Sequence, residues 1–239
     1  MLLALSLGLT AAAANVLGGF FIVRRDWSRQ YLKYFLALGA GFMLAAAFLE
    51  VIPESIRLAG RSAPFLVLVG YFLVHFFEHT LAPHFHFGEE THTEEMAPQH
   101  ASYAALLGLV IHTFFDGVAI ASGFLISTWL GGVIFLAVFL HKLPEGFTVA
   151  SFMLASGQSR RVAFGASALL GAATVVGVLL MSLLHREVGY ALPVSAGVTV
   201  YVAATDLVPE VNREPGVRMA LVVFLGVALM LALQRLFHM

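Results

Sequence analysis

Eight long apolar runs follow one another along this chain and leave few choices of fold. Inside hydrocarbon only a helix or a closed barrel satisfies its own backbone groups, and about 20 residues make one helical crossing. Strand-like alternation over stretches of about ten residues is absent, which argues against a barrel. The sequence therefore predicts an all-α integral membrane protein with one transmembrane domain over residues 1–239. The runs span residues 2–23, 31–56, 63–82, 102–125, 129–155, 162–184, 189–211 and 216–237.

Composition agrees with a protein that lies in lipid. Hydrophobic residues make up 60% of the 239 residues and charged residues 11%, with a mean hydropathy of +0.90. The net charge of −1 offers no basic surface for nucleic acid, so we expect no nucleic-acid partner. Without cysteine the chain has no disulfide and no thiolate metal ligand. The first run lacks a basic n-region and is longer than a signal-peptide core, so it is expected to be a retained span.

Lysines and arginines in the loops predict the orientation. Eight fall on one side of the eight-span topology and four on the other, with Lys142 inside a span. The larger group is expected in the cytoplasm. Both termini would then lie on the extracytoplasmic side of the cell membrane (a plasma or inner membrane). The larger group is Arg24, Arg25, Arg29, Lys33, Arg160, Arg161, Arg213 and Arg218; the smaller is Arg57, Arg61, Arg186 and Arg235.

One long polar segment, about residues 83–101, joins the third and fourth runs and is predicted to be cytoplasmic. It contains four histidines among four glutamates: His84, His86, His92 and His100 with Glu89, Glu90, Glu94 and Glu95. A solvated linker and a weak metal-collecting tract are both compatible with this composition.

An internal repeat relates the second run to the seventh. "AGFMLAAAFLEVIPE" (40–54) and "AGVTVYVAATDLVPE" (196–210) align with a shift of 156 residues, matching Glu50 with Asp206. Three runs precede the central pair and three follow it, so the two copies would cross the membrane in opposite directions. A 3+2+3 inverted repeat of this kind is typical of secondary transporters, whose site lies near the membrane midplane.

The fourth and fifth runs carry the same motif twice. "HTFFDG" (112–117) and "HKLPEG" (141–146) each place an acid four residues after a histidine, on one face of a helix. Two such faces would bring together His112, Asp116, His141 and Glu145, a nitrogen and oxygen set that suits zinc, iron(II) or manganese. The alternative is a packed, hydrogen-bonded polar contact between helices; the repetition of the spacing favours a metal site.

Three prolines lie inside the runs, next to ionisable residues. Pro144 would free the carbonyl of the residue before His141, and Pro53 and Pro209 would free carbonyls beside Glu50 and Asp206. Broken helices beside acids are consistent with an ion pathway, although proline can also bend a helix for packing alone.

With "HTFFDG", "HKLPEG" and "YVAATDLVPE" (201–210) in eight runs, the sequence resembles the ZIP (Zrt-/Irt-like) family of divalent metal transporters. The resemblance covers nearly the whole chain. It implies an eight-helix 3+2+3 bundle with extracytoplasmic termini and a primary metal site of His112, Asp116, His141 and Glu145. By the same resemblance, Met43 would add a thioether and Glu50 would lie along the metal pathway.

Lys142 and Thr113 depart from the family pattern. Many members place there ligands for a second metal, whereas an ammonium has no lone pair to donate and repels a dication. We therefore predict a single-metal variant, GufA-like, in which Lys142 replaces the second ion. The alternative is that Lys142 reaches a membrane interface.

The predicted function is movement of Zn²⁺, with Fe²⁺, Mn²⁺ and Cd²⁺ as further candidates, into the cytoplasm by alternating access. The ion is the transported substrate; no prosthetic group and no enzymatic activity are expected. Because protons compete for the ligands, uptake should weaken below about pH 6. The alternatives are a membrane metalloenzyme with the same ligands, and a channel or structural protein. A homodimer is one option for the oligomeric state.

Overall fold

The computed structural model describes residues 2–24, 32–81, 99–214 and 216–237, and throughout these ranges the chain forms helices joined by turns. The predicted loop of about residues 83–101 falls largely outside the described residues; its last residues belong to a helix. The helices are α1 Leu2–Arg24, α2 Leu32–Ala46, η1 Ala47–Val51, α3 Ile52–Ala59, η2 Gly60–Ser62, α4 Ala63–Leu81, α5 Gln99–Ile126, α6 Thr128–Ala155, α7 Arg160–Leu183, η4 His185–Glu187, α8 Val188–Tyr201, η5 Val202–Leu207, α9 Val208–Asn212 and α10 Val217–Phe237.

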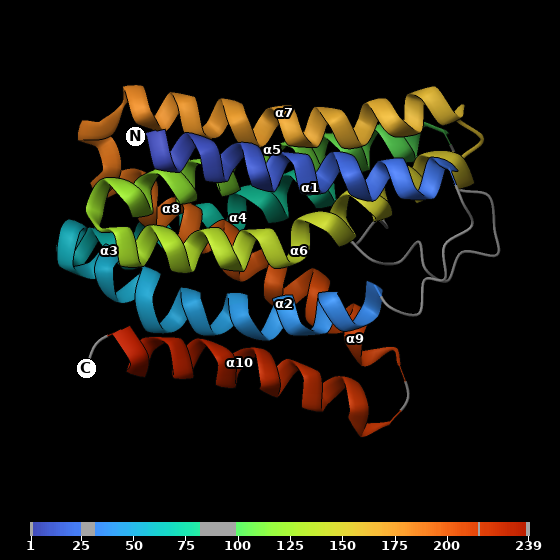
Figure 1. Ribbon diagram of the computed structural model, residues 1–239. Helices are drawn as coiled ribbons and strands as arrows, with labels where there is room; N and C mark the ends of the chain where they lie inside the picture. Colours follow the sequence, from blue (N-terminus) through green and yellow to red (C-terminus); the bar gives the residue numbers. More distant parts are fainter. Residues whose placement is uncertain (1, 25–31, 82–98, 215, 238–239) are drawn as a thin grey trace.

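Among the described residues, seven helical stretches are long and apolar enough to cross a membrane. One of them, Lys33–Phe77, has 45 residues, about twice what a single crossing needs. It is divided at Gly60–Ser62, where Gly60 adopts φ +55° and α4 then turns back beside α3 (Figure 1). Divided there, the stretch is long enough for two crossings; the total of eight crossings stays a prediction.

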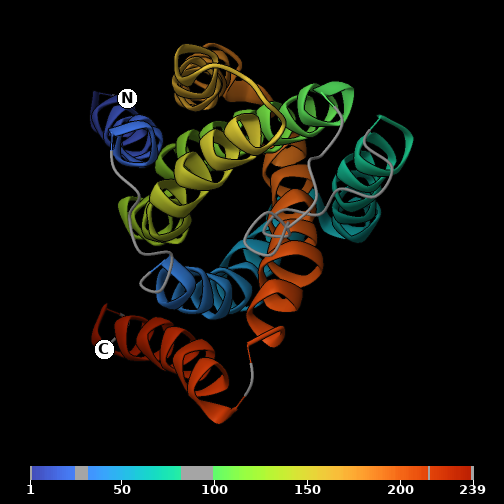
Figure 2. The ribbon, with the colours of Figure 1, turned by 90° about the vertical axis from the view of Figure 1, so that its right-hand side faces the viewer.

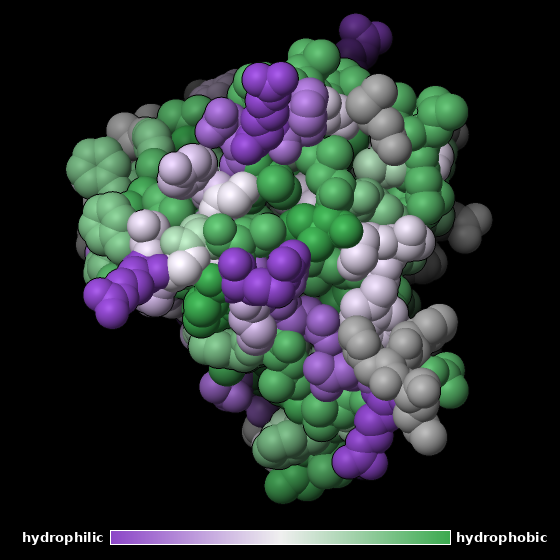
Figure 3. Space-filling view, turned by 90° about the vertical axis from the view of Figure 1, so that its left-hand side faces the viewer, coloured by the Kyte–Doolittle hydropathy of each residue, from purple (hydrophilic) through white to green (hydrophobic). Residues whose placement is uncertain are grey.

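The helices form a bundle in which their long axes are roughly parallel or antiparallel, with both termini at one end (Figure 1). Seen along the axis, α5 and α6 lie against α1 and α7, while α10 covers α2 and α4 covers α8 (Figure 2). Hydrophilic groups are scattered over the end that carries the termini (Figure 3). The four arginines that charge counting assigns to that side, Arg57, Arg61, Arg186 and Arg235, are all exposed. Which side of a membrane this end faces stays a prediction.

Two π-helical turns interrupt the second and seventh runs, each just before a proline. Ala47–Val51 precedes Pro53 and Val202–Leu207 precedes Pro209. Because proline has no N–H and crowds the preceding turn, the backbone there widens rather than breaks. Around Pro144, by contrast, α6 continues as a single α-helix from residue 128 to residue 155. The predicted opening of the helix therefore takes the form of wide turns in two runs and is not seen as a break in α6.

Glycine contacts show how closely the outer helices approach α5 and α6. A Cβ atom placed at Gly18 of α1 would lie 2.2 Å from the carbonyl oxygen of Leu143 in α6. A Cβ at Gly177 of α7 would lie 2.1 Å from the carbonyl oxygen of Phe114 in α5. Only glycine allows two helices to approach this closely. Leu143 and Phe114 are 29 residues apart, the same offset that separates the two His-x-x-x-acid motifs.

A second set of contacts follows the 156-residue shift. A Cβ at Gly41 in α2 would meet the carbonyl oxygen of Val223 in α10 at 2.0 Å, and one at Gly197 in α8 would meet that of Val67 in α4 at 1.9 Å. Gly41 shifted forward by 156 residues is Gly197, and Val223 shifted back by 156 residues is Val67, so the two contacts correspond. These matched contacts are consistent with the inverted repeat, which stays a prediction.

Candidate metal centre

The hairpin of α5 and α6 holds all four predicted ligands. The helices are separated by Ser127 alone, whose hydroxyl caps α6 by accepting the N–H of Leu130 at 3.1 Å. Near this turn the backbones almost touch, since a Cβ at Gly123 would lie 2.9 Å from the Cα of Gly131. The short connection makes the helices antiparallel neighbours, so the faces that carry the two motifs meet inside the bundle.

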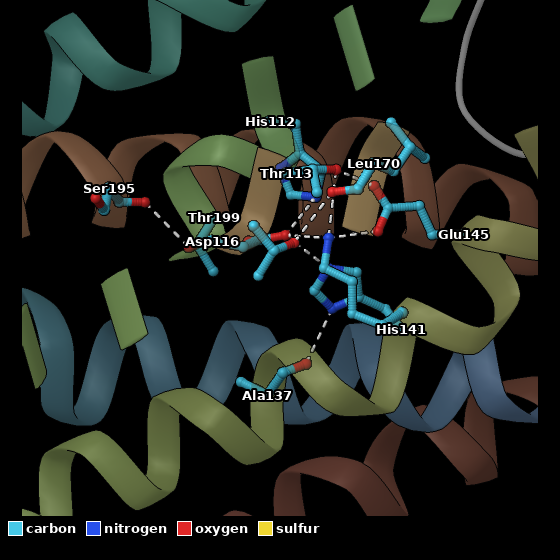
Figure 4. A network of polar contacts seen from close by, with 11 residues as sticks. His112, Thr113, Asp116, Ala137, His141, Glu145, Leu170, Ser195 and Thr199 are labelled. Carbon is cyan, nitrogen blue, oxygen red and sulfur yellow. Dashed lines mark hydrogen bonds and ion pairs between the residues drawn. The ribbon is translucent and has the colours of Figure 1, made fainter. Parts of the chain in front are cut away.

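Four ligand atoms, one from each of the predicted residues, lie within 4.8 Å of one another. The side chains of His112, Asp116, His141 and Glu145 are 3%, 1%, 0% and 0% exposed. Figure 4 shows these side chains converging between the helices. The structure thus brings together the residues that the two motifs place on facing helices.

Asp116 lies at the middle of the cluster. Its Oδ2 is 3.2 Å from His112 Nε2 and 3.3 Å from His141 Nε2. Ligand atoms of a tetrahedral zinc site with bonds of about 2.0–2.2 Å are separated by about 3.3–3.6 Å, so these spacings are close to those of a coordination shell. Within the described residues, Asp116 Oδ1 and both ring nitrogens of His112 have no hydrogen-bond partner. A carboxylate oxygen and an imidazole lone pair that are buried without a donor fit a site built for a cation.

The ring of His141 is oriented by its own helix. Its Nδ1 lies 3.0 Å from the carbonyl oxygen of Ala137, which can only accept, so Nδ1 carries the proton. In the neutral ring the lone pair is then on Nε2, the nitrogen that faces Asp116. A carbonyl that fixes the tautomer of a histidine in this way is common behind metal ligands.

The ammonium of Lys142 lies among the carboxylates. Its Nζ is 2.6 Å from Asp116 Oδ2, forms a short contact with Glu145 Oε2 and lies 3.4 Å from Thr113 Oγ1. The Thr113 hydroxyl donates to Glu145 Oε1 at 2.5 Å. Lys142 is fully buried, so within the bundle it pairs with the acids and does not reach an interface.

The model of the ZIP zinc transporter family matches residues 1–105 and 88–234 of the chain. The chain belongs to the ZIP family. It is therefore an integral membrane protein of a transporter family, and the comparisons favour a transporter over the metalloenzyme alternative.

Three curated relatives illustrate the range of similarity to this ZIP chain. The zinc transporter ZIP13 homolog of Drosophila melanogaster is 29% identical over 156 residues, covering 61% of this chain and 44% of the fly protein. Zinc transporter ZIP9-B of Xenopus laevis is 23% identical over 259 residues, 86% of this chain and 84% of its own. Zinc transporter ZIP4 of Homo sapiens is 34% identical over 114 residues, 46% of this chain and 18% of the human protein. The chain thus spans less than half of the fly and human relatives.

Two further residues that the resemblance implied come from the second run and not from the α5–α6 hairpin. Met43 is fully buried and lines a small cavity of about 10 Å³ with Ala137 and Thr199, room for at most about one water. Glu50, in the π-helical turn of the second run, accepts a hydrogen bond of 2.9 Å from Gln234 of α10. Roles for Met43 in the ZIP site and for Glu50 in the pathway stay predictions.

Sequence reasoning missed Asn15 of α1. This side chain is fully buried, and neither of its amide atoms has a hydrogen-bond partner within the described residues. The available signal was a single asparagine in the apolar run "TAAAANVLGG", because polar residues inside a ZIP span are costly and often functional.

Proposed function

We propose that this chain carries Zn²⁺, or a similar first-row dication, across its membrane through the site of His112, Asp116, His141 and Glu145. The observation that carries the proposal is the convergence of these side chains from two helices, within 4.8 Å and almost entirely buried. Isolated charges are costly at membrane depth, so titratable groups gathered there are expected to serve a substrate.

In this mechanism the ion exchanges its waters for the four ligands, and alternating access then opens the site to the other side. The neutral imidazole of His141 presents Nε2 because Ala137 holds its Nδ1 proton. Asp116 and Glu145 supply two negative charges and Lys142 one positive charge, so the cluster carries one negative charge in excess before the ion arrives. This net negative charge favours binding of a cation, and the positive charge of Lys142 keeps that binding reversible.

We further propose that the site holds one ion at a time. The Lys142 ammonium contacts both carboxylates, so it supplies a positive charge beside the first ion that repels a second dication. Isothermal titration of the purified protein with zinc should give a stoichiometry of one, and Lys142→Ala should raise that number or leave it at one. Two ions bound by the native protein would refute the single-ion proposal.

Cytoplasmic delivery, extracytoplasmic termini, a location in the cell or inner membrane and assembly as a homodimer belong to the same proposal. The loop charges support the orientation of the termini; the direction of delivery, the membrane and the homodimer rest on the resemblance alone. The relatives are named as zinc transporters, which makes zinc the first cation to test.

The function is tested by metal uptake into proteoliposomes, with zinc, iron(II), manganese and cadmium in competition. His141→Ala and Glu145→Ala should abolish uptake. Matched controls are His185→Ala and Glu187→Gln, which change exposed residues of η4 and should leave uptake intact.

The dependence of flux on concentration separates the three classes of protein. A carrier saturates, a channel need not, and an enzyme moves no metal. Uptake that persists in both His141→Ala and Glu145→Ala would contradict the proposed site.

A further inference from the structure

Asn15 belongs to a pair of equivalent positions on either side of the α5–α6 hairpin. A Cβ at Gly146 in α6 would lie 1.9 Å from the carbonyl oxygen of Asn15 in α1. A Cβ at Gly117 in α5 would lie 2.0 Å from the carbonyl oxygen of Thr174 in α7. Each glycine directly follows a site carboxylate, so Asn15 and Thr174 occupy the same place in the two halves.

Asn15 and Thr174 each pack on a helix face that also carries one of the two site residues that depart from the family pattern, Lys142 or Thr113. Lys142 and Gly146 are four residues apart on one face of α6, and Thr113 and Gly117 are likewise on one face of α5. Asn15 therefore lies against the face of α6 from which Lys142 projects. In the other half, the residues equivalent to Lys142 and Asn15 are both threonine, Thr113 and Thr174.

The two buried polar residues differ in how they are satisfied. The Thr174 hydroxyl bonds its own helix, at 3.4 Å from the carbonyl oxygen of Leu170. Both amide atoms of Asn15 lack a partner among the described residues, although the side chain is fully buried. A buried amide without a hydrogen bond destabilises the fold and so calls for an explanation.

Metal binding would take a carboxylate acceptor from the Lys142 ammonium, and the Asn15 amide could replace it. The ammonium of Lys142 contacts the same Asp116 oxygen that lies beside the two imidazoles, so an ion at the four ligands competes with it for that oxygen. The dication also repels the ammonium strongly in a low-dielectric interior. A displaced buried ammonium is costly unless it finds another acceptor.

We propose that Asn15 is a positioning residue whose side-chain carbonyl accepts the Lys142 ammonium when a metal ion takes Asp116 and Glu145. It makes no bond to the metal. The proposal deepens the proposed function, on which it rests: the amide makes the lysine displaceable, and so lets one site alternate between an internal cation and a transported one.

The test is a double-mutant cycle read by isothermal titration of zinc. Asn15→Leu should weaken zinc binding by about tenfold or more, the value of one hydrogen bond to a charged group. In a Lys142→Met background the same substitution should change zinc affinity by less than about twofold, because no ammonium then needs the amide. Thr174→Val, the equivalent position in the other half, should also stay within about twofold of the native affinity.

Thermal unfolding without metal guards against a purely structural explanation. Asn15→Leu removes an unpartnered buried amide and should unfold at the native temperature or above it, while zinc binding falls. If Asn15→Leu does not fold, Asn15→Ala removes the same amide without adding volume, and the same loss of affinity is expected.

Two results overturn the proposal: native zinc affinity in the Asn15 variants, or an equal loss with and without Lys142. Zinc binding that survives His141→Ala and Glu145→Ala would instead refute the metal centre itself. The two failures are therefore distinguishable.

Discussion

The two halves of the candidate site share a scaffold and differ in chemistry. In one half α7 packs on α5, in the other α1 packs on α6, and the glycine contacts at the crossings agree within 0.1 Å: 2.1 and 2.2 Å at Gly177 and Gly18, 2.0 and 1.9 Å at Gly117 and Gly146. The buried polar pair is Thr113 and Thr174 in the first half, and Lys142 and Asn15 in the second.

This difference separates what positions the ligands from what acts on the ion. Backbone approach is governed by small residues and is the same on both sides, so it holds the two histidines and the two acids in matching places. To a single side, the asymmetric residues add one positive charge and one amide that has no partner within the described part of the chain. That division can be tested by substituting equivalent residues in the two halves and comparing the effects.

The largest effect is expected where the halves meet, at Asp116. Its Oδ2 lies within 3.3 Å of His112, His141 and Lys142, whereas Glu145 contacts Lys142 and Thr113. Asp116→Asn should weaken zinc binding by at least about a hundredfold, since even partners outside the ligand shell are worth about 10–100-fold in metal affinity. Glu145→Gln should weaken binding less.

Zinc titration of both variants, with an unfolding scan to confirm that they fold, decides the order. A smaller loss for Asp116→Asn than for Glu145→Gln would show that the acids do not divide the work as the distances suggest.

The next effect should be the same in both halves. Gly117→Ala and Gly146→Ala each place a methyl group about 2 Å from a backbone oxygen, so the helices must separate. Overpacking of this kind costs about 1–3 kcal/mol, and both variants should unfold at lower temperature by similar amounts. Gly132→Ala is the control, because a Cβ there meets nothing within 4 Å.

Unequal losses from the two alanine variants would break the structural equivalence of the halves. A loss from Gly132→Ala as large as theirs would show that the crossing contacts are not the cause.

A third comparison sets Thr113 against Thr174. Thr113 donates to the Glu145 carboxylate at 2.5 Å, while among the described residues Thr174 donates to its own helix, at Leu170. Thr113→Val should weaken zinc binding by about tenfold, because a hydrogen bond to a charged group contributes about 1.5–3 kcal/mol. Zinc titration should show a clear difference from Thr174→Val; equal effects would mean that Thr113 does not hold Glu145 in place.

Much of this arrangement could be predicted from the sequence because its signals are local. A bilayer needs apolar runs of a set length, so helix ends were located within a few residues; α5 begins at Gln99 rather than residue 102. The i, i+4 spacing fixed which side chains share a face, and that was enough to group His112, Asp116, His141 and Glu145.

What the sequence could not give depends on how distant helices cross. Prolines located the irregular turns at Pro53 and Pro209, but widening to a π turn depends on the packing around them. Whether Lys142 pairs or reaches an interface depends on where Asp116 lies on another helix. The burial of Asn15 against Gly146 is a crossing of residues 131 positions apart, for which no local pattern exists.

The smallest effect is expected at a contact that only one of the two repeat copies has. Lys33 at the start of α2 pairs with Glu214, near the start of α10, at 2.7 Å, with both side chains under a third exposed. The positions related by the 156-residue shift are Gly189 and Leu58, which cannot form an ion pair. Pairs open to solvent contribute about 0–1 kcal/mol and are screened by salt. Lys33→Met should therefore lower the unfolding temperature only slightly at low ionic strength and not at high salt, and Lys33→Met with Glu214→Gln should add little to either change alone. A large, salt-independent loss would mean that this contact, although absent from the other copy, helps to hold α10 against α2.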